Sequence, residues 1–120
     1  MNITVPNSTV HAPANRFTVR FEDFSAAHTE VILLIGNLKP LQHAFVDNEG
    51  AWEAVVDAPS GKYKCTLQIT VLTYKSVGRA YDTKVLVLET NGAKLIASTQ
   101  GNVPNGDQSD IGDASFELVV

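Results

Sequence analysis

The nine residues YKCTLQITV, numbered 63–71, decide the fold class of this chain. Apolar side chains occupy every odd position of this stretch, and polar or charged side chains occupy every even position. Successive side chains of a β-strand point to opposite faces of the sheet, so the alternation predicts a strand with one buried and one exposed face. Phe17, Val19 and Phe21 repeat the pattern in a shorter segment, where they alternate with Thr18 and Arg20.

Turn-forming sequences separate these two segments from the other candidates for strands. Residues 47–50, 59–61 and 91–92 are rich in Asn, Asp, Pro, Ser and Gly, which favour tight turns. No apolar period of 3.6 residues extends past one helical turn. Short strands joined by turns predict an all-β chain, folded as an antiparallel sandwich or barrel. The further strand candidates are residues 30–38, 41–46, 51–56, 82–88, 95–98 and 115–120.

The run VILLI at residues 31–35 is apolar at every position. Such a run is typical of a strand that is covered on both faces, or of a central strand near a subunit contact. We therefore expect lysine at Ile32 or Leu34 to destroy folding or assembly. This strand and the apolar C-terminal residues Phe116, Leu118, Val119 and Val120 are candidate contacts for a homodimer or a higher homo-oligomer.

Length and charge limit the classes of function. The chain has 120 residues, and its 13 acidic and 9 basic side chains give a net charge of −4. The length predicts one domain over residues 1–120. The acidic balance argues against nucleic acid as a partner, and no apolar run reaches the roughly 18 residues of a membrane span. No secretion signal is visible, so the expectation is a cytoplasmic protein or one exported by a non-classical route.

Catalytic apparatus is not visible in the sequence, and we expect a protein that is not an enzyme. The residues form neither a paired acid and base nor an activated nucleophile, which leaves a hydrolase as the weakest of three function classes. Cys65 falls on the apolar side of its strand and is interpreted as a small core residue. Trp52 fits either a core aromatic or an exposed platform for a sugar ring.

Residues 99–112 form the longest stretch without strand alternation, fourteen residues rich in Gly, Asn, Asp and Ser. We expect an irregular loop here, and loops of this length inside a compact domain are often functional. Calcium takes six to eight oxygen ligands from carboxylates, amides and backbone carbonyls. The residues in and beside this stretch that offer side-chain oxygens are Asn102, Asn105, Asp107, Asp110 and Asp113. A solvated polar loop without a metal is the alternative.

Three short motifs resemble the bacterial fucose-binding lectin II family, the LecB-like calcium lectins. PANRFTV at residues 13–19 is similar to the opening strand of that family, and SGK at residues 60–62 to its middle hairpin. DIGDA at residues 110–114 is similar to the calcium loop. The resemblance implies a nine-stranded antiparallel β-sandwich. It also implies two calcium ions on the acidic loop that bind the hydroxyls of fucose or mannose directly.

Carried over by position, Asp110 and Asp113 match two aspartates that bridge the ions in the family. Gly112 and Gln108 stand where the family has an asparagine and an aspartate ligand, and Phe24 stands at another asparagine ligand. The family also ends in a glycine whose carboxylate reaches a neighbouring site, whereas this chain ends in valine. These departures predict a divergent member with a degenerate calcium and sugar loop.

The first expected function is a non-catalytic, lectin-like module that binds a mono- or oligosaccharide. Asp107, Asp110 and Asp113 would hold calcium. The sugar-binding residues would be Ser25, Ala26, Ala27, Asn102 and Asn105. The alternative is a structural or oligomerisation β-sandwich that has lost metal and sugar binding.

Overall fold

The computed structural model describes residues 1–46, 50–73 and 78–120, and the regular elements among them are all strands. Of the predicted turn at residues 47–50, positions 47–49 lie outside the described residues. In chain order, the strands are β1 (Thr9–His11), β2 (Arg16–Asp23), β3 (His28–Ile35), β4 (Leu41–Phe45), β5 (Ala51–Asp57), β6 (Lys62–Leu72), β7 (Ala80–Glu89), β8 (Gly92–Asn102) and β9 (Ser109–Val119).

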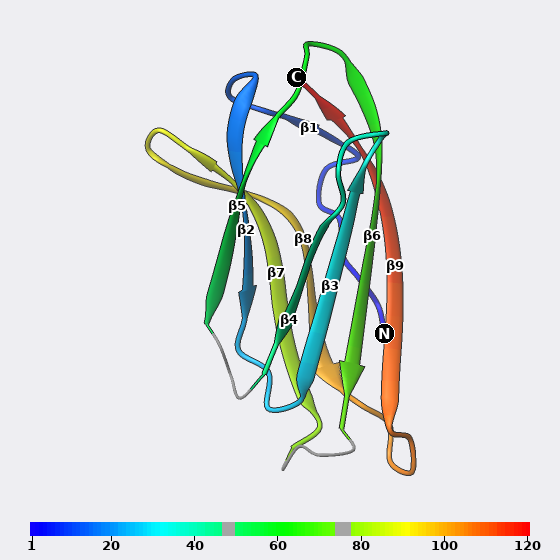
Figure 1. The fold of residues 1–120 in the computed structure, drawn as a ribbon. Helices are drawn as coiled ribbons and strands as arrows, with labels where there is room; N and C mark the ends of the chain where they lie inside the picture. The colour runs from blue at the N-terminus through cyan, green and yellow to red at the C-terminus, as the bar shows by residue number, and fades with distance from the viewer. Residues whose placement is uncertain (47–49, 74–77) are drawn as a thin grey trace.

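The strands form two sheets that pack face to face (Figure 1). One sheet has five strands in the order β1-β9-β6-β3-β4, and the other has four in the order β5-β2-β7-β8. Neighbouring strands are antiparallel, except that β1 runs parallel to β9. The predicted all-β sandwich is therefore confirmed, and the barrel alternative is excluded. The described part of the chain holds no helix that could span a membrane.

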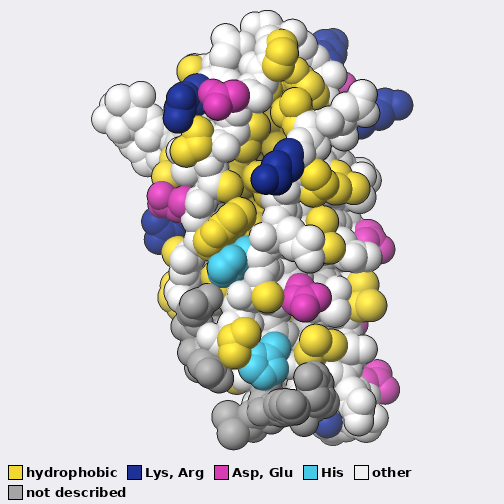
Figure 2. Space-filling view, in the orientation of Figure 1, with side chains coloured by type: hydrophobic (Ala, Val, Ile, Leu, Met, Phe, Trp, Pro, Cys, Tyr) yellow, Lys and Arg dark blue, Asp and Glu magenta, His cyan; other side chains and the backbone are white. Residues whose placement is uncertain are grey.

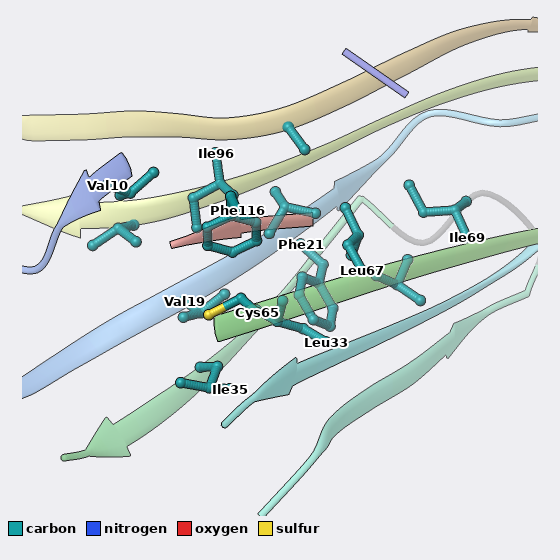
Figure 3. Close-up of a cluster of buried hydrophobic side chains, with 14 of the residues drawn as sticks. Val10, Val19, Phe21, Leu33, Ile35, Cys65, Leu67, Ile69, Ile96 and Phe116 are labelled. Carbon is teal, nitrogen blue, oxygen red and sulfur yellow. The ribbon is translucent and has the colours of Figure 1, made fainter. Parts of the chain in front are cut away.

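The alternation at residues 63–71 produces the central strand of the five-stranded sheet. β6 pairs with β3 on one side and with β9 on the other, and its odd-numbered residues from Cys65 onward are buried. Leu67 and Ile69 point from this sheet into the layer that also holds Phe21 of the opposite sheet (Figure 3). Cys65 is buried, which confirms its interpretation as a small core residue, and the burial raises the pKa of its thiol to about 11.

The prediction that both faces of residues 31–35 are buried is wrong for the single chain. Val31, Leu33 and Ile35 face the core, whereas Ile32 is half-buried and Leu34 is 42% exposed. The register decides this, because Ile32 and Leu34 lie opposite polar residues of β6 and share its outer face. A subunit contact through this outer face stays a prediction.

Leu34→Lys is consequently expected to leave the fold intact, contrary to the expectation from the sequence. The lysine would extend from the outer face into solvent, and substitutions at such positions change the unfolding free energy by about 0.5 kcal/mol or less. Urea denaturation followed by tryptophan fluorescence measures the change. A variant that is unfolded in buffer would contradict the outward orientation of Leu34.

The predicted irregular loop at residues 99–112 is also wrong in its extent. β8 continues to Asn102 and β9 begins at Ser109, which leaves only residues 103–108 between them. Asn, Gly and Asp have low intrinsic strand preference, but here they pair with two long alternating strands. Ala80 of β7 lies opposite Asn102, and Leu72 of β6 lies opposite Ser109. Pairing with these partners overrides the local preference.

The N-terminal segment, residues 1–12, closes one side of the sandwich. Thr4 and Ser98 of β8 exchange two backbone hydrogen bonds of 2.8 and 3.0 Å, and β1 then pairs with β9 of the other sheet. Met1, Ile3 and Val5 pack against the core between these contacts. One extended segment thus joins both sheets along their β8 and β9 side.

Candidate functional site

The loop at residues 103–108 is held by a cation that comes from a distant part of the sequence. The Arg79 guanidinium donates hydrogen bonds from Nη1 to the carbonyl oxygens of Pro104 (2.8 Å) and Asp107 (2.9 Å). Gly106 supplies the left-handed backbone of the turn, with φ of +90°. These carbonyls are the kind of oxygen that a calcium loop offers to its ion. In this structure they accept hydrogen bonds from a side chain instead.

The three predicted calcium ligands do not converge. Asp107 lies exposed in the loop, whereas Asp110 and Asp113 are both part of β9. Asp110 lies opposite the buried Val71, and Asp113 lies opposite Gln68 on the outer face. Side chains three positions apart in a strand point to opposite faces of the sheet, so this strand does not bring the two carboxylates together around one ion. Among the described residues, no group of three or more His, Cys, Asp or Glu side chains could hold a metal.

Both carboxylate oxygens of Asp110 are already occupied by groups of the same chain. The Met1 ammonium lies 3.1 Å from Oδ1, and the Tyr81 hydroxyl donates to Oδ2 at 3.2 Å. Burial raises the pKa of Tyr81, and the neighbouring Asp110 charge raises it further. Asp110 therefore acts as the centre of an internal polar contact between β9, β7 and the N-terminal segment.

The predicted sugar-binding residues at positions 25–27 are mostly inaccessible. Ser25 is 1% exposed and Ala27 is 3% exposed, while Ala26 remains at the surface. The Ser25 hydroxyl donates to Asp23 Oδ1 (2.5 Å) and accepts from the backbone NH of Asp82 (3.0 Å). Ser25 thus supports the strand that carries Asp82, and it cannot contact a ligand directly in this conformation.

Asp23 is a fully buried carboxylate beneath this turn. Its Oδ1 also accepts a hydrogen bond of 2.8 Å from the Thr83 hydroxyl. Its Oδ2 and the Thr29 hydroxyl of the opposite sheet make no hydrogen bond of ordinary geometry with the described residues, although Thr29 interacts with this carboxyl group. Burial raises the pKa of Asp23, and hydrogen bonds from nearby hydroxyls, Ser25 foremost, offset part of this rise.

A polar hollow lies beside the end of β8, near the predicted residue Asn102, which does not itself line it. Asn102 and Gln100 lie opposite Ala80 and Asp82 of β7, on the outer face of the four-stranded sheet. A hollow of about 360 Å³ opens on this face next to them. Its lining side chains are all polar, and they are Asn2, Thr4, Asp82, Lys84, Ser98, Thr99 and Gln100. The exposed Asn105 lies in the turn beyond β8 and does not line it.

Three segments fix the walls of this polar hollow. The backbone hydrogen bonds between Thr4 and Ser98 hold the N-terminal segment beside β8, and the Thr99 hydroxyl donates to the carbonyl oxygen of Asn2 at 2.8 Å. Asp82 is anchored through its backbone by Ser25. The accessible side chains of the hollow offer a carboxylate acceptor, an ammonium donor, two amides and the hydroxyls of Thr4 and Ser98, whereas the Thr99 hydroxyl is buried and bonded to Asn2. Such a set can bind a neutral ligand that carries several hydroxyl groups.

Sequence reasoning missed most of this hollow. Asp82 and Lys84 are two residues apart in a predicted strand, so their common face could have been predicted from the alternation. Ser98 is the last residue of the strand predicted at residues 95–98, and Gln100 would have followed on the same face if that strand had been extended. Asn2 carries no sequence signal, because only the tertiary pairing of the N-terminal segment brings it to β8.

Comparison with known proteins adds no relative to this description. No family model matches the chain, and no curated protein or solved structure matches it either. The resemblance to the LecB-like lectins therefore stays a prediction that rests on the three short motifs quoted above.

Proposed function

We propose that this protein is a non-catalytic carbohydrate-binding module, and that the polar hollow on the outer face of β7 and β8 holds a sugar unit. The observation that carries the proposal is the composition of the lining, in which all seven residues have polar side chains. A sugar hydroxyl both donates and accepts hydrogen bonds. Asp82 can accept, Lys84 can donate, and the amides and hydroxyls around them can do either.

The placement of carboxylates supports binding without catalysis. Glycoside hydrolases use two carboxyl groups on either side of the scissile bond. Asp82 is the one carboxylate among the described residues that line the hollow. The neighbouring Lys84 lies opposite Glu22 of β2, which brings a second carboxylate to the same sheet face but not into the lining.

Calcium binding by Asp107, Asp110 and Asp113 stays a prediction, and the proposed sugar site does not require it. The positions of the three aspartates favour a sugar site that works without an ion. Binding to the hollow should consequently persist in the presence of a chelator, which separates this proposal from calcium-mediated recognition in the LecB-like manner.

Two matched substitutions distinguish the hollow from the predicted calcium site. Asp82→Asn should weaken sugar binding about ten- to a hundredfold, because a hydrogen bond to a charged group contributes about 1.5–3 kcal/mol. Asp113→Asn is the same chemical change on an outer face of the other sheet and should leave the affinity unchanged. Binding of both variants to a panel of immobilised sugars that includes mannose and fucose measures the difference. The reverse pattern would overturn the proposal.

A structural or oligomerisation module is the second candidate function. The observation that favours it is the outer face of the five-stranded sheet, where Leu34 is 42% exposed and Ile111 is 53% exposed. Apolar side chains on an outer sheet face suit a contact between copies of the chain. Light scattering over a hundredfold range of protein concentration tests this candidate, since a constant monomer mass would exclude it.

A further inference from the structure

The two sheets have free edges on the same side of the molecule. β4 is the last strand of the five-stranded sheet, and β5 is the last strand of the four-stranded sheet. Among the described residues, each pairs with a neighbour on one side only. An edge strand presents unpaired backbone NH and carbonyl groups, which can bind another extended chain.

An apolar groove lies between these two edges. A hollow of about 490 Å³ is lined by Lys39, Pro40, Leu41, Gln42, Trp52, Ala54 and Val55. A second hollow of about 160 Å³ shares Lys39, Leu41 and Val55 with it and continues toward Leu38, Val56 and the acidic Asp57. On the face shown in Figure 2, hydrophobic side chains gather over this part of the molecule.

Trp52 forms the rigid floor of the groove. Its indole packs against Phe21 of the core with a centroid distance of 5.2 Å, and His43 of β4 stacks on it at 5.0 Å with an interplanar angle of 8°. The stack joins the two sheets beneath the groove. Val55, which is 54% exposed, points away from the core on the same edge strand. The groove therefore combines a fixed aromatic floor with accessible apolar walls.

The opposite side of the sandwich shows what covers such a side in this fold. There, the N-terminal segment pairs with β8 of one sheet and β9 of the other, and its apolar side chains pack inward between them. An extended segment with alternating apolar residues thus pairs with the outer strands of both sheets and also fills the apolar space between them. The β4 and β5 side offers the same two kinds of contact, backbone groups and an apolar hollow, and no described segment of the chain covers it.

The charged residues of the groove indicate which charge the bound segment should carry. Lys39 is the one charged side chain that lines the larger hollow, and no described residue pairs with it. Glu53 of β5 pairs with Arg20 at 3.0 Å, and Asp57, which lines the smaller hollow, lies 3.9 Å from Arg16. An acidic side chain on the bound segment would complement Lys39.

We propose that the groove between β4 and β5 binds an extended peptide segment of a partner protein, which adds a strand to an edge and places an acidic residue beside Lys39. The segment would carry apolar side chains at alternate positions, so that one face enters the groove. This surface lies on the other edge of the four-stranded sheet from β8 and the polar hollow, so it is independent of the proposed sugar site.

Amide chemical-shift mapping with synthetic peptides tests the proposal. The probe is the blocked peptide Ser-Val-Thr-Val-Glu-Val-Thr-Ser. One control peptide has Lys in place of Glu, and another has Pro in place of both the first Thr and the second Val, so that a backbone donor is lost whichever set of NH groups faces the edge strand. Titration into the ¹⁵N-labelled protein should shift amides of β4 and β5 saturably. The Lys peptide should bind about three- to fivefold more weakly, because Lys39 is exposed and exposed ion pairs are weak, and the Pro peptide should lose binding.

Two protein variants complete the test. Lys39→Glu should reverse the preference between the Glu and Lys peptides, whereas the matched Lys64→Glu, at an exposed position of β6, should not. Shifts outside β4 and β5, equal binding of the Pro peptide, or the same preference in Lys39→Glu would each overturn the proposal. So would a concentration-dependent dimer that uses β4 and β5, because a second copy would then be the occupant.

Discussion

Phe21→Ala is expected to lower the free energy of unfolding by about 3–5 kcal/mol, the range found for Phe to Ala changes in protein cores. Phe21 is fully buried on β2, where its strand pairs with both β5 and β7. Its ring packs against Trp52, so the substitution would leave a cavity beneath the indole as well as between the sheets. Few other single changes in this chain should cost as much.

Equilibrium denaturation in urea measures this loss, and Ile111→Ala is the matched control. Ile111 is 53% exposed on the outer face of β9, and its truncation should change the unfolding free energy by about 0.5 kcal/mol or less. A loss below about 1 kcal/mol for Phe21→Ala would contradict the position of this ring at the centre of the core.

Asp23→Asn is expected to raise the free energy of unfolding at pH 7 by about 1–3 kcal/mol. A buried polar group without a well-formed hydrogen bond destabilises a protein by about this amount, and the substitution would relieve that cost in the wild type. Asparagine keeps the oxygen that accepts from Ser25 and Thr83. Its amide also supplies a donor at the position of the Asp23 oxygen that has no well-formed hydrogen bond, on a carboxyl group with which the Thr29 hydroxyl interacts. The substitution therefore removes a buried charge and offers Thr29 a hydrogen bond.

The pH dependence of the difference in unfolding free energy between Asp23→Asn and the wild type tests whether the buried charge causes it. The pKa of Asp23 is raised in the folded state, so its protonated form favours folding. The stability that Asp23 contributes is complete below the unfolded pKa, about 3.9, and is lost as the pH rises through the higher folded pKa. The advantage of Asp23→Asn should accordingly shrink toward pH 4 and grow toward pH 7. Denaturation curves at several pH values measure it, and a variant less stable than the wild type throughout this range would contradict the account.

Strand alternation predicted the elements that form the centre of each sheet. The stretch at residues 63–71 became β6, which extends only one residue further at each end, and residues 17–21 lie within β2. These strands alternate because one of their faces is buried. The all-apolar run at residues 31–35 gave no such information, since the side chains themselves do not say which face meets the core. Pairing with β6 decided that Leu34 faces outward.

The site depended on contacts that local sequence does not encode. Asp110 and Asp113 resembled a calcium loop because Gly and Asp separate them, yet pairing with β6 draws both into a strand and turns them to opposite faces. Arg79, which holds the loop, comes from before β7. The polar hollow joins Asn2 to Asp82 and Gln100, three residues that only the sheet topology brings together.

The most direct test of the proposed function is a chemical-shift titration of the ¹⁵N-labelled wild-type protein with methyl glycosides of mannose, fucose, galactose, glucose and N-acetylglucosamine. EDTA is present first, and calcium is then added in excess. The account predicts that at least one sugar shifts the amides around residues 82–84 and 98–100 in EDTA, and that calcium changes neither the affinity nor the location. Shifts confined to residues 105–113 and dependent on calcium, or no shift with any sugar, would contradict it.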